Sequence, residues 1–177
     1  MKNIWHDVNP SRISPEDFLA VIEISKGSKK KYELDKETGM LILDRILYTS
    51  THYPANYGFI PRTYADDMDP LDVLVLCSEQ IDPMTLVRCY PIGVISMVDN
   101  GRQDEKILAI PFSDPSYHSY TDISQLPNHI FAEMSHFFTV YKELENKQTA
   151  VKETSGREDA VKIIRSAIEN YRGKYCR

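Results

Sequence analysis

The sequence predicts a mainly β, α+β fold in which a small barrel is covered by two C-terminal helices. Runs of branched apolar residues occupy the first two thirds of the chain, and apolar residues at three- and four-residue steps occupy the last third. Strands that precede the helices, without alternating with them, argue against a doubly wound parallel sheet. The 177 residues are enough to bury one core. We therefore expect a single domain over residues 1–177.

Several segments are predicted as strands because they are rich in branched apolar residues or alternate in polarity. They cover residues 18–24, 31–34, 40–45, 73–76, 85–98 and 107–110. In the second strand the alternation places Lys31 and Glu33 on one face, and a short loop joins it to the third strand as a hairpin. The long strand is expected to bend at Pro91 and Gly93, because such bends let small barrels turn corners.

Other segments carry turn and helix signals. Residues 14–17 predict a short helical turn with Ser14 as its N-cap. Residues 48–63 have prolines and a glycine among aromatic side chains, which predicts an extended, packed segment. Apolar spacing predicts a helix at 127–146, and a second helix follows a capping box at 155–158.

Composition narrows the classes of protein. The chain has 21 Lys and Arg against 26 Asp and Glu, for a net charge of −5, which argues against a nucleic-acid-coating surface. The N-terminus lacks the apolar stretch of a signal peptide, and no apolar run approaches the ~18 residues of a membrane span. The three cysteines are scattered and suggest neither a disulfide framework nor a zinc site. We expect a cytoplasmic protein that binds neither nucleic acid nor membrane.

An acidic turn leads into the strand that begins at Val73. Asp67, Asp69 and Asp72 crowd this turn, and a second acidic loop at 99–106 leaves a neighbouring strand. If both loops open at one rim, their carboxylates repel one another unless divalent cations lie among them. Hard oxygen ligands favour Mg²⁺, Mn²⁺ or Ca²⁺.

Basic side chains lie on the segments that border these loops. They are Lys31, Arg45, Lys106 and Lys142. Carboxylates that hold cations, beside cationic groups that hold a polyanion, are what phosphoryl transfer requires, since that chemistry depends on positioning and charge neutralisation.

A series of motifs then matches a known family in order. The motifs are Glu23, Lys31-Tyr32-Glu33, Asp44-Arg45, Tyr53-Pro54-x-x-Tyr57-Gly58, Asp67-x-Asp69-Pro70-x-Asp72-Val73-Leu74-Val75, Asp99-x4-Asp104-x-Lys106 and Tyr141-Lys142-x-Leu144-Glu145. Over about residues 18–146 the chain resembles the soluble family I inorganic pyrophosphatases of the compact bacterial type. The resemblance implies a closed, five-stranded barrel of the oligonucleotide/oligosaccharide-binding (OB) type with flanking helices. It also implies Mg²⁺-dependent hydrolysis of pyrophosphate to two orthophosphates, with several ions per site and Mn²⁺ or a similar ion able to substitute.

The resemblance also implies roles for individual residues. The metal ligands it implies are Asp67, Asp72 and Asp104 for activating ions, and Asp99 and Glu33 for ions that arrive with the substrate. Asp69 resembles the general base for the attacking water. The substrate contacts it implies are Lys31, Arg45, Tyr57, Tyr141, Lys142 and Lys106, with Glu23 and Tyr53 in support.

The sequence departs from the family pattern at three places. Met68 stands where the family usually has glycine, so the turn must accept a side chain or bear strain. After Glu145 relatives tend to have a glycine, a lysine and a tryptophan, but residues 146–150 differ, and the contribution of that lysine is expected to be missing. His136 matches a histidine at a bacterial subunit contact, whereas Val140 replaces a second one. We expect a homo-oligomer, a homohexamer if it follows bacterial relatives.

Structural interpretations stand beside these roles. Lys31 and Glu33 also fit an exposed ion pair, Tyr141 follows the apolar stripe of its helix, and Arg45 can pair with Asp44. For the whole chain, a catalytically weakened barrel that binds metal or polyanion is the alternative.

Two further classes fit the sequence less well. A single-stranded nucleic-acid module would need a basic groove, which the acidic rim opposes. A structural calcium protein of the EF-hand type would need a ligand pattern that residues 67–78 lack.

Overall fold

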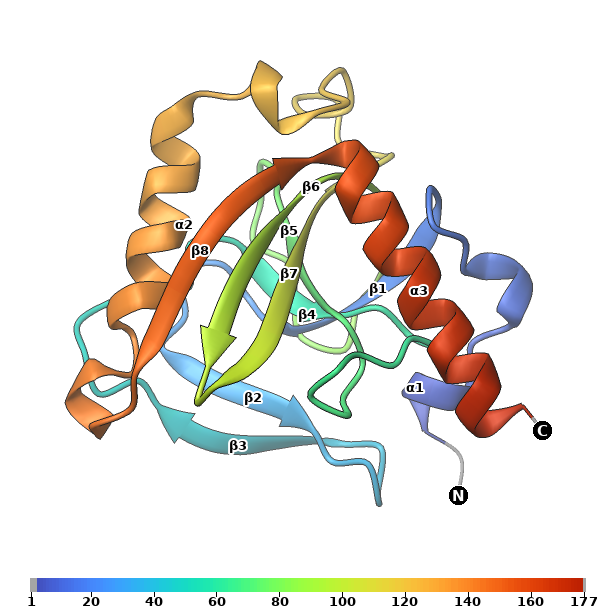
Figure 1. The fold of residues 1–177 in the computed structure, drawn as a ribbon, viewed down its shortest axis with the longest axis horizontal. Helices are drawn as coiled ribbons and strands as arrows, with labels where there is room; N and C mark the ends of the chain where they lie inside the picture. The colour runs from blue at the N-terminus through green and yellow to red at the C-terminus, as the bar shows by residue number, and fades with distance from the viewer. Residues whose placement is uncertain (1–2, 177) are drawn as a thin grey trace.

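The computed structural model describes residues 3–176 (Figure 1). The strands are β1 (Phe18–Ile24), β2 (Lys30–Leu34), β3 (Leu41–Ile46), β4 (Asn56–Phe59), β5 (Asp72–Val75), β6 (Leu86–Asp99), β7 (Arg102–Pro111) and β8 (Thr149–Gly156). The helices are α1 (Ile4–Asp7), α2 (Asn128–Val140) and α3 (Arg157–Tyr175), with short 3-10 turns η1 (Pro10–Arg12), η2 (Ile123–Gln125) and η3 (Glu143–Glu145).

A closed ring of strands forms the centre of the molecule. Its order is β1-β4-β5-β7-β6, and pairing of β6 with β1 closes it. The first part of β6 pairs with β1 and its second part pairs with β8. Between these parts, the pairing of β6 with β7 shifts in register from Pro91 to Gly93. The expected bend is therefore confirmed, as is the barrel. Strands β1 and β4 approach so closely that a Cβ on Gly58 would lie 1.8 Å from the carbonyl oxygen of Val21.

Both faces of the barrel strands are buried. Val73 and Val75 of β5 pack in one apolar cluster with residues of α3, whereas Leu74 and Leu76 pack in a second cluster with residues of α2. Burial on both faces explains why these strands are continuous apolar runs and do not alternate. Figure 1 shows α2 and α3 on opposite sides of the strands, as expected of a barrel between two helices. Among residues 3–176, every helix is too short or too polar to span a membrane.

The β2–β3 hairpin is confirmed, but the second acidic loop is shorter than expected. Strand β7 begins at Arg102, so β6 and β7 are joined by Asn100 and Gly101, whose φ angles are 49° and 81°. Two successive positive φ values are typical of tight hairpin turns, and Asn-Gly is the dipeptide that adopts them most readily. Asp104 therefore lies on a strand and has a fixed direction.

The expected helix at 127–146 ends six residues early, and a strand that we did not predict follows it. The apolar period continues to Leu144, but this side chain is 64% exposed because the chain reverses to place β8 beside β6. The hydroxyl of Thr149 in β8 donates to the carbonyl of Phe138 at 2.5 Å, which satisfies the end of α2. Strand β8 is polar and lies at the edge of the sheet, so its sequence carried little strand signal.

Two predicted caps were wrong in detail. Helix α3 begins at Arg157, but its backbone N–H donates to the Asp122 carboxylate at 2.9 Å, and no capping box forms at 155–158. Residues 14–17 form a bend without helix, although the hydroxyl of Ser14 does accept the backbone N–H of Asp17 at 3.1 Å. A distant side chain replaced the local cap in the first case, which sequence spacing does not reveal.

Candidate active site

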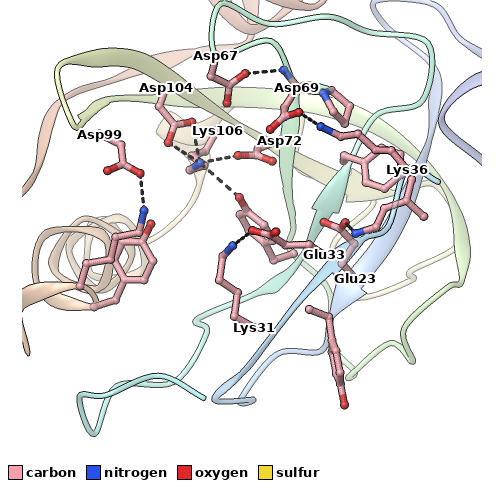
Figure 2. Close-up of a pocket in the computed structure, with 17 residues that line it drawn as sticks. Glu23, Lys31, Glu33, Lys36, Asp67, Asp69, Asp72, Asp99, Asp104 and Lys106 are labelled. Carbon is pink, nitrogen blue, oxygen red and sulfur yellow. Dashed lines mark hydrogen bonds and ion pairs between the residues drawn. The ribbon is translucent and has the colours of Figure 1, made fainter. Parts of the chain in front are cut away.

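Acidic and basic side chains gather around one pocket of about 260 Å³ at the rim of the barrel (Figure 2). The pocket is lined by Glu23, Lys31, Tyr32, Glu33, Leu34, Lys36, Tyr57, Phe59, Asp67, Asp69, Pro70, Asp72, Asp99, Asp104, Lys106, Tyr141 and Lys142. The two acidic segments thus meet at one rim, as the sequence predicted. All the predicted site residues line this pocket except Arg45 and Tyr53.

The acidic turn is held by its own backbone. The N–H of Ala65 donates to the carbonyl of Asp69 at 2.8 Å, and the N–H of Asp69 donates to the Asp67 carboxylate at 3.0 Å. Met68 has φ of 75° and is 55% exposed, so the turn accepts a side chain in the left-handed conformation that glycine adopts freely. Burial raises the pKa of Asp67 to about 6, and the nearby Asp72 charge adds to this rise.

Lys106, Asp72 and Asp104 form the floor of the pocket. Strands β5 and β7 are parallel and place Asp72 opposite Lys106, whose Nζ lies 2.5 Å from Asp72 and 2.7 Å from Asp104. The Tyr57 hydroxyl lies 3.3 Å from the same Nζ. Burial opposes the charge of Lys106, but the two carboxylates raise its pKa well above the usual value. Burial raises the pKa of Asp104.

Glu23 reaches the pocket because β1 changes register there. Its pairing with β4 shifts between Ile22 and Ile24, and a bulge of this kind re-aims the side chain within it. One Glu23 oxygen accepts the backbone N–H of Leu34 at 2.7 Å. Burial raises the pKa of this carboxyl to about 8, so Glu23 carries a proton near neutral pH.

Lys31 and Lys142 reach the pocket from β2 and from the segment after α2. Lys31 and Glu33 of β2 form an ion pair, and Lys142 pairs with Asp99 at the end of β6. Tyr141 is the C-cap of α2 and keeps the helical conformation, and Lys142 follows it, so that both side chains line the pocket. Burial raises the pKa of the Tyr141 hydroxyl, so this side chain is a neutral hydrogen-bond donor.

Arg45 and Tyr53 are not among the residues that line the pocket. Arg45 donates through Nε to Glu145 at 2.8 Å and also pairs with Asp44, which is the structural interpretation that the sequence left open. Tyr53 is 2% exposed, and its ring centroid lies 4.8 Å from that of Phe137. Tyr53 also packs against Tyr57, with 5.3 Å between the ring centroids, so its contact with a pocket residue is through its ring.

Sequence reasoning missed one lysine of the pocket, Lys36. Lys36 lines the pocket and pairs with Asp69, but it lies in the β2–β3 loop, where no period or spacing indicates its direction. Asn146 takes the left-handed conformation at φ of 56°, and Lys147 then places its Nζ 3.6 Å from Glu145. Lys147 does not line the pocket, and the expected loss of the contribution of the family lysine stays a prediction.

The donor set fits divalent cations beside an anion. Within residues 3–176, no three acidic, histidine or cysteine side chains are arranged as a ready-made cation site, and lysines lie among the carboxylates. In the same part of the chain, the buried side-chain atoms without a hydrogen-bond partner are Asp99 Oδ1 and Arg45 Nη2. The first is an acceptor suited to a cation and the second a donor suited to a phosphate oxygen.

The fold and the pocket together define a class: an OB-type barrel with a carboxylate- and lysine-rich rim of the kind that phosphoryl transfer uses. Comparison with known proteins agrees with this class. The pattern of the family described as inorganic pyrophosphatase matches residues 20–172. The chain therefore belongs to the inorganic pyrophosphatase family, as the resemblance predicted.

Individual relatives match along nearly the whole chain. Soluble inorganic pyrophosphatase 2 of Chlamydomonas reinhardtii is 48% identical over 97% of this chain and 89% of its own length. The crystal structure of the inorganic pyrophosphatase of Thermus thermophilus matches with a TM-score of 0.93 and 34% identity, covering 97% of this chain and 100% of that one. The inorganic pyrophosphatase of Helicobacter pylori matches with a TM-score of 0.90 and 42% identity, covering 95% and 100%.

Proposed function

We propose that this chain is a single catalytic domain that hydrolyses inorganic pyrophosphate to two orthophosphates with Mg²⁺, and that Asp69 is the general base. The observation that carries the proposal is the convergence of acidic and basic side chains from separate elements on one small pocket. Pyrophosphate is a polyanion, and binding it requires several positive charges in a confined space. Family membership supports the same reaction.

The carboxylates of the pocket are the proposed metal ligands. Asp67, Asp72 and Asp104 would hold activating ions, with Asp99 and Glu33 for ions bound together with the substrate. When bound, such ions lower the pKa of water and neutralise phosphate oxygens. Asp69 lies on the exposed side of the acidic turn, where it can accept the proton of the attacking water.

The basic and phenolic side chains are the proposed substrate contacts. They are Lys31, Arg45, Tyr57, Lys106, Tyr141 and Lys142. Lys31 and Lys142 now neutralise Glu33 and Asp99, and each would turn to a phosphate oxygen once cations take over those carboxylates. The Tyr57 and Tyr141 hydroxyls, kept neutral by burial, would donate hydrogen bonds that fix the direction of the leaving phosphate.

The experiment is phosphate release from pyrophosphate with and without Mg²⁺. We expect hydrolysis that requires the metal and falls about 10²- to 10⁴-fold in Asp69→Asn, the range that general bases contribute. Asp66→Asn is the matched control, because Asp66 belongs to the same turn but is exposed and does not line the pocket. A wild type that is inactive with both Mg²⁺ and Mn²⁺ would favour the alternative of a metal- or polyanion-binding barrel.

The proposal also covers the cellular compartment and the oligomeric state of the enzyme. We place it in the cytoplasm as a homo-oligomer, with a homohexamer as the form that the resemblance implies. His136, the residue matched to a subunit contact, is exposed on α2 and so accessible to a second copy. Sedimentation velocity of the wild type and of His136→Ala tests this assembly, and a monomeric wild type would refute it.

A further inference from the structure

The Asp69 carboxylate is paired with a lysine that no predicted role includes. Lys36 reaches it from the β2–β3 loop, and the two side chains are 48% and 51% exposed. In the view of Figure 2, Lys36 and Asp104 lie on opposite sides of Asp69. An exposed pair of this kind contributes little to stability, so its position in the active site is the feature to explain.

Lys36 is held at both ends. Its backbone carbonyl accepts the side-chain N–H of Asn3 at 2.9 Å, and Asn3 is buried. Its ammonium group lies 5.4 Å from the ring centroid of Trp5, within the range of a cation–π interaction. The loop itself is closed by the N–H of Asp35, which donates to the carbonyl of Met40 at 2.8 Å. These contacts restrict where the Lys36 side chain can go.

Trp5 is fixed to the segment that enters the acidic turn. Its indole N–H donates to the carbonyl of Thr63 at 2.9 Å, and its own carbonyl accepts the N–H of Arg62 at 2.9 Å. Its ring stacks on Tyr64 at 6.5 Å between centroids. The Trp5 ring, which lies next to the Lys36 ammonium group, is therefore bound to the chain segment that leads to Asp69. These contacts fix the position of the lysine relative to the carboxylate.

We propose that Lys36 is a positioning residue for Asp69 and that Trp5 is the platform that holds Lys36 in place. The inference rests on the proposed function, in which Asp69 is the base. Lys36 restricts the rotation of the Asp69 carboxylate, so that an oxygen remains directed at the attacking water while cations occupy the neighbouring acids. Three segments far apart in the sequence, namely α1, the β2–β3 loop and the acidic turn, thus set the direction of one side chain.

The test compares steady-state kinetics of Lys36→Met, Lys36→Arg and Lys30→Met at saturating Mg²⁺. Lys30 is the matched control, because it is an exposed lysine 5.9 Å from an aromatic ring, that of Tyr32, and does not line the pocket. We expect Lys36→Met to lower kcat about tenfold with KM within about twofold, since a displaced base acts on catalysis and not on binding. Lys36→Arg should retain at least about half of kcat, because arginine keeps the charge and can also make a cation–π contact with the Trp5 ring.

A second readout does not depend on turnover. Trp5 is the single tryptophan of the chain, so its fluorescence reports on the platform. In metal-free protein Lys36→Met should change the Trp5 emission, whereas Lys30→Met should not. Isothermal titration with Mn²⁺ should give affinities within about threefold of the wild type for all three variants, because the ion pair of Lys36 is with Asp69 and not with a proposed metal ligand.

Several outcomes would overturn the inference. An unchanged or raised kcat in Lys36→Met would show that Lys36 is dispensable or obstructs the site, and a raised KM with unchanged kcat would make it a substrate contact. Failure of Lys36→Arg to restore kcat would remove the role of the charge. A wild type that releases no phosphate defeats the proposed function together with this inference, whereas an active wild type with unaffected Lys36→Met defeats the inference alone.

Discussion

The floor and the open edge of the pocket use the same kind of ion pair in two different environments. At the floor, Lys106 is 4% exposed and lies between Asp72 and Asp104. At the open edge, Lys36 and Asp69 are both about half exposed. Removing one partner of a buried pair leaves an uncompensated charge, which costs about 3–5 kcal/mol, whereas an exposed pair contributes about 0–1 kcal/mol. Stability therefore depends on the floor pair, whereas the edge pair contributes little to stability, in keeping with a role in directing the Asp69 carboxylate.

The largest expected effect is the loss of stability when the lysine of the pocket floor is removed. Lys106→Met leaves Asp72 and Asp104 close together without their cation, so we expect the free energy of unfolding to fall by about 3 kcal/mol without divalent metal. Urea denaturation in EDTA measures the loss. Added Mg²⁺ should restore part of it, because a cation among the carboxylates replaces the missing charge. A loss below about 1 kcal/mol would show that the buried pair at the floor contributes no more to stability than an exposed pair.

The second prediction concerns how the buried carboxyl of Glu23 makes the stability of the fold depend on pH. The pKa of Glu23 is raised from 4.5 to about 8 by burial, so the folded protein binds this proton more tightly than the unfolded chain does. The contribution of the Glu23 proton to the free energy of unfolding is therefore largest below pH 4.5 and is lost as the pH rises towards 8. Glu23→Gln should remove this decline and stabilise the fold by roughly 2–4 kcal/mol at pH 8.

Urea denaturation at pH 5, 7 and 8 measures the Glu23 effect. Glu33→Gln is the control, because Glu33 is also a pocket glutamate of a neighbouring strand but is exposed. If both variants keep the pH dependence of the wild-type stability, the burial of Glu23 is not the cause of that dependence.

The third prediction concerns backbone strain at the edge. Met68 holds φ of 75°, so Met68→Gly should stabilise the fold by about 0.5–1 kcal/mol, less the entropy that glycine loses on folding. Met84→Gly is the matched control, since Met84 has φ of 65° and lies outside the pocket. Thermal unfolding should show a similar gain for both variants. A gain at Met84 alone would indicate that the acidic turn relaxes to another conformation.

The smallest expected effect is on the stability of the exposed pair. Lys36→Met should change the free energy of unfolding by less than about 0.5 kcal/mol, because water already screens both charges. Urea denaturation at 0.05 M and 0.5 M NaCl tests this, and the difference from wild type should vanish at high salt. A change as large as that of Lys106→Met would erase the distinction between floor and edge.

The sequence by itself determined which charged segments meet at the pocket and most of the barrel. Carboxylates at 67, 69 and 72 precede a buried strand, and a Pro91–Gly93 bend interrupts a long one, so local spacing predicted both features. These two signals are local, because backbone preferences and apolar periods act over a few residues. The family resemblance, and not a local signal, predicted that the turn at Met68 must accept a side chain or bear strain, and the φ of Met68 is positive.

Tertiary structure decided what depends on distant partners. The end of α2 was set by the Thr149 hydroxyl and the start of α3 by the Asp122 carboxylate, each from another element. Strand β8 is polar and became a strand because β6 offered an unpaired edge. Lys36 entered the pocket because α1 and its Trp5 ring hold it there. Such contacts join residues far apart in the chain, and their energies arise only once burial and the closed barrel bring the partners together.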